Sequence, residues 1–490
     1  MLKELPSAVC EVAFPADPDF PQLKIASDPA LMLEMFRAHL RPVPGKSYHI
    51  QDCVPFRFRC RQSTSRCVLQ YSLRLVEPGT GRELNQWVTG VVYAEDGQAE
   101  RLWQETRASD PGQEIPDGWR SFEPICFIPS LQMLVQVFPY DRKLPNLCRV
   151  MSGALRFLEP QLLAHFGPGQ WRAQQRQIEP TRYRTEMGAA LKYTLHTRDA
   201  LTGRSQTRRF YLKVYRNDHG QETFELLKSF AESGLDFQHS TRFRAQERPY
   251  SVVRPIAYLT ELRTLVLEEA EGTSLQQLLV QGHHPQTAVR AVARAVAAFN
   301  RDSPLPSDGR GVRGEGALGI RRHHPLVEQF DDVKRASTLV QWACPELREE
   351  AKAITAAVVG GLKEVPPAPI HRDLKPDHIF LHGDRVIFID LDSVALGDPV
   401  RDPAHLFAHV TARVGMDSLP QEQAQLAASA FVEEYFAHAP EPWKEQFALH
   451  CAGALIEVAG GIFKRQEAHW AEKVAVCVEE ARRVLKGGLK

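Results

Sequence analysis

The residues able to carry out chemistry are concentrated in one stretch, IHRDLKPDHIFLHGDRVIFIDLDSVALGDPVRDPAHLFAHV at 370–410. Two β-rich apolar runs, HIFL and VIFIDL, flank the turn HGDR, and this pattern predicts a hairpin. One flank of the hairpin carries Asp373 and His378, and the other carries Asp390 and Asp392. Carboxylates at the mouth of a hairpin suit phosphoryl transfer, because one aspartate can accept or orient the attacking hydroxyl while others hold Mg²⁺ against the phosphates.

The same stretch resembles the protein kinase-like fold. HRDLKPDH is similar to its catalytic loop H-R-D-x-x-x-x-N, and FIDLD stands where that fold has its metal-binding D-F-G. No A-P-E element follows, and IDLDSVALGDPVRDPAHLFAH instead resembles the I-D-x-x…G-D-P-x-x-D stretch of the aminoglycoside phosphotransferase family. Upstream, LKVY with Lys213 resembles the family's lysine-bearing strand, and LVLEEAEGTSL at 265–275 resembles its interlobe hinge. The resemblance covers residues 153–486.

The resemblance implies a role for each matching residue. Asp373 would be the catalytic base, and Lys375 would lie near the transferred γ-phosphate as a point charge. The implied metal ligands are Asp390 as the principal one, Asp392 and His378. The implied ATP contacts are Lys213 at the α/β-phosphates, Gly188 near the phosphates, and the hinge backbone of Glu269 and Ala270 at adenine. Internal bracing of the loop is expected from His371 and Arg372, and a structural turn or helix-cap role from Asp398 and Asp402.

Three positions depart from the family pattern. His378 stands where the family has an asparagine as a second metal ligand, and imidazole suits Mn²⁺ better than Mg²⁺, so either cation is considered. The expected nucleotide loop, RYRTEMGAALKYTL at 182–195, contains the single Gly188 and no GxGxxG. The ion-pair partner of Lys213 is either Glu222 or Glu225, and helical periodicity does not choose between them.

Part of the chain repeats itself. Residues 69–96 align without a gap to residues 191–218, and nine of the 28 positions are identical. A unit of roughly 120 residues is therefore predicted twice. In the first copy Val91 stands where the second has Lys213, and Pro139, which lacks an N–H, stands where the second has Ala270. We expect the first copy to be a nonfunctional duplicate of the nucleotide-binding lobe with a packing, interaction or substrate-capping role, and one nucleotide site per chain, between 181–270 and 371–392.

The order of these segments predicts the fold class and three parts. An α+β, bilobal protein kinase-like fold is expected, with a β-rich N-lobe and a helical C-lobe preceded by a second copy of the N-lobe unit. The predicted boundaries are 1–150 for the degenerate N-lobe-like domain, 151–280 for the nucleotide-binding N-lobe and 281–490 for the helical catalytic C-lobe. The Pro/Gly-rich segment at 303–319 is expected to be a loop, either a lid or a simple connection.

Composition narrows the function classes. The 490 residues contain 60 Lys+Arg and 60 Asp+Glu, a balance that disfavours nucleic acid and anionic membranes as partners. The N-terminus has no apolar core of a signal peptide, and the apolar stretch at 447–463 carries His450 and Glu457, which favours a buried helix. Nine cysteines with no CxxC pair favour reduced thiols and a cytoplasmic location.

The leading prediction is an ATP-dependent phosphotransferase that transfers the γ-phosphoryl group to a hydroxyl of a small molecule. The alternatives are a pseudokinase-like binding scaffold, favoured by His378 and the degenerate first copy, and a Ser/Thr protein kinase, which the missing A-P-E disfavours. The acceptor is not predicted, although an aminoglycoside would require acidic residues, for which the candidates are Glu433, Glu434 and Glu457; solvated helix faces explain these acids equally well. Residues 1–150 are a candidate surface for a partner or for self-association.

Overall fold

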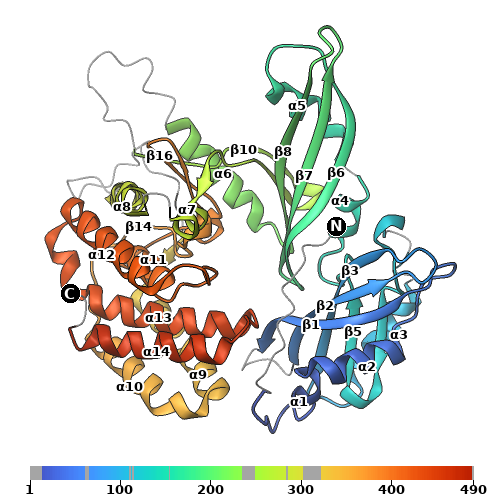
Figure 1. Cartoon of the computed structure of the whole chain (residues 1–490), viewed down its shortest axis with the longest axis horizontal. Coiled ribbons are helices and arrows are strands. Elements are labelled where there is room, and N and C mark those ends of the chain that lie inside the picture. Colours follow the sequence, from blue (N-terminus) through green and yellow to red (C-terminus); the bar gives the residue numbers. More distant parts are fainter. Residues whose placement is uncertain are drawn as a thin grey trace. The chain divides into compact units, whose positions relative to one another are not determined.

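A computed structural model describes residues 14–60, 66–109, 112, 115–153, 155–233, 249–282, 285–301, 320 and 322–487. The chain divides into two compact units (Figure 1). The first comprises residues 1–221, 256–269 and 464–469, and the second comprises 222–255, 270–463 and 470–490. One boundary falls between Glu269 and Ala270, inside the segment predicted to be the interlobe hinge. The predicted loop at 303–319 lies outside the described residues.

The first unit contains two five-stranded antiparallel sheets. The first sheet has the order β1-β2-β3-β5-β4, and the second has the order β6-β7-β8-β11-β10. Their bounds are β1 (His49–Cys60), β2 (Arg66–Val76), β3 (Glu83–Tyr93), β4 (Ile125–Ile128), β5 (Met133–Val137), β6 (Trp171–Arg184), β7 (Gly188–Asp199), β8 (Ser205–Tyr215), β10 (Pro255–Leu259) and β11 (Thr264–Glu268). The helices are α1 (Leu23–Ala26), α2 (Pro29–His39), α3 (Gln98–Ala108), α4 (Asn146–Met151) and α5 (Glu159–Leu163), and α6 (His219–Ser233) spans the boundary between the units.

The two sheets share their register as well as their strand order. Val91 on β3 pairs with Val68 on β2, and Lys213 on β8 pairs with Ala190 on β7, so the sequence offset of 122 holds on both strands. The outer strands β1 and β6 occupy equivalent edges, although prolines and charged residues hide their alternation in the sequence. The interpretation of the first sheet as a degenerate nucleotide-binding lobe, and the boundary at residue 150, stay predictions.

One hydrophobic core joins the two sheets of the first unit. It contains Trp87 and Phe138 from the first sheet and Tyr183 from the second, whose ring stacks on Trp87 with centroids 6.5 Å apart. Leucines of α5 and the preceding turn, among them Leu158 and Leu162, cover the same core. Part of the apolar surface of the first sheet is therefore buried against the second sheet.

The second unit is mainly helical and carries two small sheets. Its strands are β9 (Tyr250–Val252), β12 (Thr273–Ser274), β13 (His323–His324), β14 (Ala368–Ile370), β15 (Ile379–His382), β16 (Arg385–Phe388) and β17 (Ala395–Gly397). Their orders are β12-β15-β16-β9 and β13-β17-β14. The helices are α7 (Leu275–Gln281), α8 (Pro285–Arg301), α9 (Leu326–Ala343), α10 (Arg348–Gly361), α11 (Arg401–Thr411), α12 (Gln421–His438), α13 (Phe447–Lys464) and α14 (Trp470–Leu485). The predicted fold class, α+β with a β-rich part and a helical part, is confirmed.

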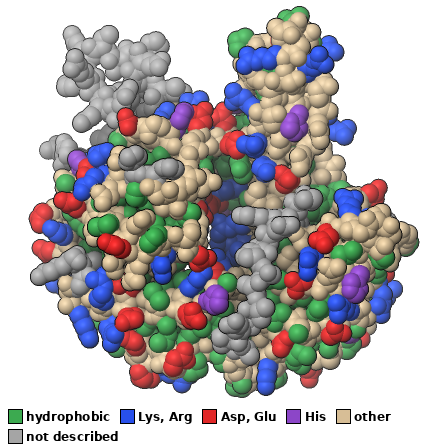
Figure 2. Space-filling view, in the orientation of Figure 1, with side chains coloured by type: hydrophobic (Ala, Val, Ile, Leu, Met, Phe, Trp, Pro, Cys, Tyr) green, Lys and Arg blue, Asp and Glu red, His purple; other side chains and the backbone are tan. Residues whose placement is uncertain are grey.

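Helix α13 lies in the core of the helical unit. Alanines, glycines and large apolar side chains alternate along it, and most of its residues are buried, including Leu455 and Phe463. The segment Glu441–Lys464 is long and apolar enough to cross a membrane by length and composition alone. However, 72% of its most apolar stretch of 18 residues is buried inside the structure. Burial of this kind is what the sequence predicted for 447–463. Acidic and basic side chains are interspersed over much of the surface in view (Figure 2).

Candidate active site

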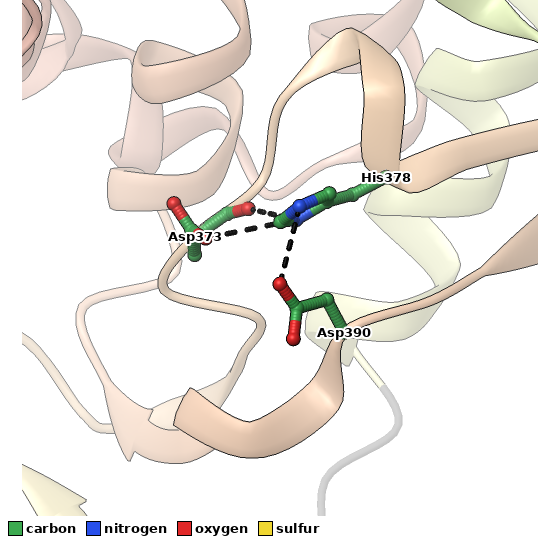
Figure 3. Close-up of side chains that lie close together, drawn as sticks. All are labelled: Asp373, His378 and Asp390. Atoms are coloured by element: carbon green, nitrogen blue, oxygen red, sulfur yellow. Dashed lines mark hydrogen bonds and ion pairs between the residues drawn. The ribbon is translucent and has the colours of Figure 1, made fainter. Parts of the chain in front are cut away.

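The predicted catalytic hairpin is present, and it brings three side chains of the second unit together (Figure 3). Asp373 follows the short strand β14, His378 ends the turn before β15, and Asp390 follows β16 directly. The ligand atoms of these three residues all lie within 4.8 Å of one another. Asp392, two residues further on, does not belong to this cluster.

The hydrogen bonds of His378 determine which ring nitrogen carries its proton. Nδ1 lies 2.9 Å from the carbonyl oxygen of Asp373, and because a carbonyl only accepts, Nδ1 must donate. Burial, followed by the charge of Lys375, lowers the pKa of His378 to about 4, so the ring is neutral at pH 7. Nε2 then presents its lone pair to a carboxylate oxygen of Asp390 at 3.2 Å. Two lone pairs this close repel each other, and a shared cation removes the repulsion.

The three donors fit a divalent cation. Two carboxylates and one unprotonated imidazole nitrogen are a donor set that Mn²⁺, Fe²⁺ or Zn²⁺ binds well and that Mg²⁺ binds less readily. The hydrogen bond from Nδ1 to the carbonyl oxygen of Asp373 also fixes the orientation of the ring, as is usual for a histidine that binds a metal. Of the three donors, His378 and Asp390 are the residues that would hold a metal, which leaves the Asp373 carboxylate beside the cation position.

Asp373 is partly exposed and charged. Its side chain is 37% exposed, and Lys375 Nζ lies 3.3 Å from its carboxylate oxygen. Burial acts to raise the pKa of Asp373, but Lys375 and the neighbouring His378 and His371 together outweigh it, and the pKa lies below the ordinary carboxyl range. A permanently ionised carboxylate can accept a hydrogen bond from an acceptor hydroxyl throughout the neutral pH range.

Backbone hydrogen bonds hold the catalytic loop in this shape. Asp402, completely buried at the start of α11, accepts from the N–H groups of His371 at 2.6 Å and Arg372 at 2.9 Å. His371 in turn donates from Nε2 to the carbonyl of Ile389 at 2.8 Å, which fixes the backbone next to Asp390. Asp390 itself adopts φ +62°, a left-handed conformation that aspartate tolerates better than most residues. The predicted structural roles of His371 and Asp402 agree with these contacts.

A second layer of residues was not predicted from the sequence. Asn300, at the end of α8, donates from Nδ2 to Asp402 and to the carbonyl of Pro369. Asp332 on α9 contacts Arg372 at 3.5 Å and the buried Arg401 at 3.4 Å. In the sequence, Asn300 is marked only as a polar residue on the apolar face of an amphipathic helix, near its C-terminal end.

The acidic residues considered for an acceptor pocket form ion pairs with the same chain. Glu457 pairs with Arg401 at 2.8 Å, and Glu433 and Glu434 pair with Arg290 at 2.7 and 3.1 Å. Burial acts to raise the pKa of Glu457, but Arg401 and His405 together lower it to about 2. These contacts account for the acids within the helical unit, and they do not support an acidic pocket for an aminoglycoside.

The predicted nucleotide contacts lie mostly in the first unit. Lys213, Gly188 and Glu269 belong to that unit, whereas Ala270 belongs to the second. On β8, Lys213 alternates with the buried Leu212 and Val214, so it lies on the sheet face opposite the hydrophobic core. Gly188 has a structural reason to be glycine, because a Cβ there would lie 2.9 Å from the carbonyl oxygen of Val214. The choice between Glu222 and Glu225 stays open.

The turn between β6 and β7, where the resemblance places the nucleotide loop, is anchored within the first unit. Thr185 and Glu186 are each 2% exposed, and Glu186 adopts φ +63°. The Glu186 carboxylate pairs with Arg66 at 2.7 Å, Arg59 at 3.4 Å and Lys143 at 3.5 Å. Sequence reasoning did not find this contact, because its partners lie more than 40 residues away along the chain.

Two acids and an imidazole arranged around one cation position, on a hairpin loop held by buried hydrogen bonds, are typical of a metal-dependent phosphoryl-transfer enzyme. The sequence model of the phosphotransferase enzyme family matches residues 196–441. The chain belongs to this family. The comparison with curated proteins returned no match.

Several solved kinases are similar to this chain. Plasmodium vivax ethanolamine kinase is 10% identical with a TM-score of 0.40, covering 71% of this chain and 96% of that one. A choline/ethanolamine kinase family protein from Mesorhizobium loti is 14% identical with a TM-score of 0.39, covering 69% and 97%. Amicoumacin kinase hAmiN, solved with AMP-PNP, Ca²⁺ and Ami, is 12% identical with a TM-score of 0.40, covering 68% and 95%.

The predicted family and enzyme class are confirmed. The chain is an ATP-dependent small-molecule phosphotransferase. Membership of this family, and not of the protein kinases, agrees with the missing A-P-E element.

Proposed function

We propose that the enzyme transfers the γ-phosphoryl group of ATP to a hydroxyl group of a small molecule at the hairpin loop of Asp373, His378 and Asp390. The convergence of their ligand atoms within 4.8 Å is the observation that carries the proposal. His378 and Asp390 would hold a divalent cation, which would supply charge neutralisation on the phosphates and make the γ-phosphorus more electrophilic. Mg²⁺ or Mn²⁺ as the metal and a cytoplasmic location stay predictions, and the choice between ATP and GTP stays open.

Asp373 is proposed to orient the acceptor and to receive its proton. As the acceptor oxygen bonds to the γ-phosphorus, the bond from phosphorus to the β,γ-bridging oxygen breaks and ADP leaves. The hydroxyl proton passes to the Asp373 carboxylate, which the lowered pKa keeps ionised until the acceptor oxygen has lost its electron density to phosphorus. Lys375, 3.3 Å from that carboxylate, is placed to stabilise charge that develops on the transferred group.

The proposal is tested by measuring phosphate transfer from ATP across a panel of hydroxylated metabolites, with Mg²⁺ and with Mn²⁺. Asp373→Asn should lower kcat by a factor on the order of 10² to 10⁴ and change nucleotide affinity little, because it removes the proton acceptor and leaves the nucleotide contacts. Asp384→Asn is the matched control, since Asp384 is exposed in the turn of the same hairpin. Wild-type turnover in Asp373→Asn would exclude the assigned role.

A further inference from the structure

The β6–β7 turn has little capacity to bind phosphate through its backbone. The N–H of Glu186 donates to the buried carboxylate of Asp141 at 2.7 Å, and the N–H of Met187 donates to the carbonyl of Arg184 at 3.0 Å. The hydroxyl of Thr185 lies 2.7 Å from that of Thr89 on β3. Amide and hydroxyl groups that a glycine-rich loop would offer to a phosphate are therefore engaged within the first unit.

Arginine side chains gather beside this turn. Arg57 and Arg59 lie on β1, Arg182 and Arg184 lie on β6, and Arg465 lies in the segment 464–469 of the same unit. Arg59 donates to the carbonyl oxygen of Thr185 at 3.2 Å, so the β1 arginines reach the turn directly. Burial, and then the like charges of Arg184, Arg182, Arg465 and Arg59, lower the pKa of Arg57 to about 9.

Two guanidinium nitrogens in this group are buried without a hydrogen-bond partner among the described residues. They are Nε of Arg57 and Nη2 of Arg465. Arg465 does pair through its Nε with Glu467 at 2.7 Å, but that contact leaves Nη2 unsatisfied. A buried charged donor requires an acceptor, so these two donors are available to an anionic ligand.

The arginines of β6 lie on the same sheet face as Lys213. Arg182 pairs with Ala190 on β7, and Ala190 pairs with Lys213 on β8, so the three residues form one cross-strand row. Directly opposed residues of neighbouring antiparallel strands point to the same face. Arg184, two residues along β6 and opposite Gly188, extends the positive charge toward the turn on that face.

We propose that Arg57, Arg182, Arg184 and Arg465 form a phosphate-binding site at the turn end of the β6–β7 hairpin. Guanidinium groups bind phosphate oxygens with two parallel N–H donors, a geometry that replaces the missing backbone cradle. The ligand is a phosphate group, either of the nucleotide or of another phosphorylated small molecule. Its assignment to the nucleotide rests on the proposed function.

The site is tested by calorimetry on the full chain with ATP, tripolyphosphate, pyrophosphate and adenosine as separate probes. Arg57→Gln and Arg182→Gln are compared with Arg172→Gln, which removes an exposed arginine near the other end of β6. Loss of one charge-assisted contact should weaken tripolyphosphate binding about tenfold or more. Thermal unfolding with and without pyrophosphate provides a second readout that does not depend on activity.

If the phosphate belongs to the nucleotide, the two variants weaken ATP and tripolyphosphate binding and leave adenosine binding unchanged. If the phosphate belongs to another molecule, Arg57→Gln and Arg182→Gln bind ATP as the wild type does. Pyrophosphate then raises the Tm of the wild type and of Arg172→Gln but does not raise the Tm of Arg57→Gln or Arg182→Gln. Wild-type binding of all four probes in both variants, with an unchanged pyrophosphate effect on the Tm, would overturn the site. Failure of the proposed function would instead appear as absent phosphate transfer with these affinities intact.

Discussion

Replacing Glu186 with glutamine should destabilise the first unit by several degrees. Glutamine keeps the size of the side chain but removes the negative charge that pairs with Arg66, Arg59 and Lys143. The backbone N–H of residue 186 can still donate to Asp141, so the turn loses the charge and keeps its backbone contact. The perturbation therefore isolates the ion-pair contribution of a buried carboxylate.

The size of the effect follows from burial. Removing one partner of a buried ion pair typically costs about 3–5 kcal/mol, because the remaining charge is left uncompensated. Glu186 is 2% exposed, but its three cations are 19–26% exposed and can partly rehydrate, so the lower end, about 3 kcal/mol, is expected. In a unit of this size each kcal/mol shifts the Tm by about 2–4 °C, which gives a decrease of about 6–12 °C.

Differential scanning calorimetry of the full chain measures this shift, and limited proteolysis at the β6–β7 turn shows where the loss occurs. Glu95→Gln is the control, because Glu95 and its partner Arg101 are 58% and 59% exposed and an exposed pair contributes less than about 1 kcal/mol. Equal Tm values for Glu186→Gln and the control would refute the argument that this carboxylate anchors the turn.

Further predictions concern the metal and nucleotide residues. If His378 ligates the metal, wild-type activity should be relatively higher with Mn²⁺ than with Mg²⁺, and His378→Asn should shift the preference toward Mg²⁺; identical metal profiles would show that His378 is not a ligand. Since burial lowers the pKa of His378 to about 4, the metal-free unfolded chain takes up a proton before the folded one does. The free energy of unfolding should therefore decrease by about 3 kcal/mol as the pH falls from about 6.5 to 4. Denaturant titrations should show this decrease for the wild type and not for His378→Asn. Lys213→Ala should weaken ATP binding at least about tenfold with one site per chain, and unchanged affinity or two sites by calorimetry would contradict the assignment of the second copy as the nucleotide lobe.

Local patterns in the sequence were sufficient for the catalytic hairpin and for the repeated sheets. Asp373 and His378 are five residues apart in one loop, and Asp390 follows the paired strand, so hairpin register alone brings them together. The ungapped offset of 122 between the two segments is matched by the common register of β2–β3 and β7–β8. The first inference uses a local strand and turn pattern and the second uses a sequence repeat, so neither requires knowing which distant residues come into contact.

Tertiary packing alone decided the contacts that hold these parts in place. The tautomer of His378 follows from a carbonyl whose position the folded loop sets, and Asp402 reaches that loop from 30 residues further along the chain. Glu186 meets its three cations, and Arg57 meets the arginines of β6, only because two sheets that are separate in sequence share one hydrophobic core. Such pairings leave no periodic signal in a single sequence, because which distant residues become neighbours depends on how entire layers pack and not on local spacing.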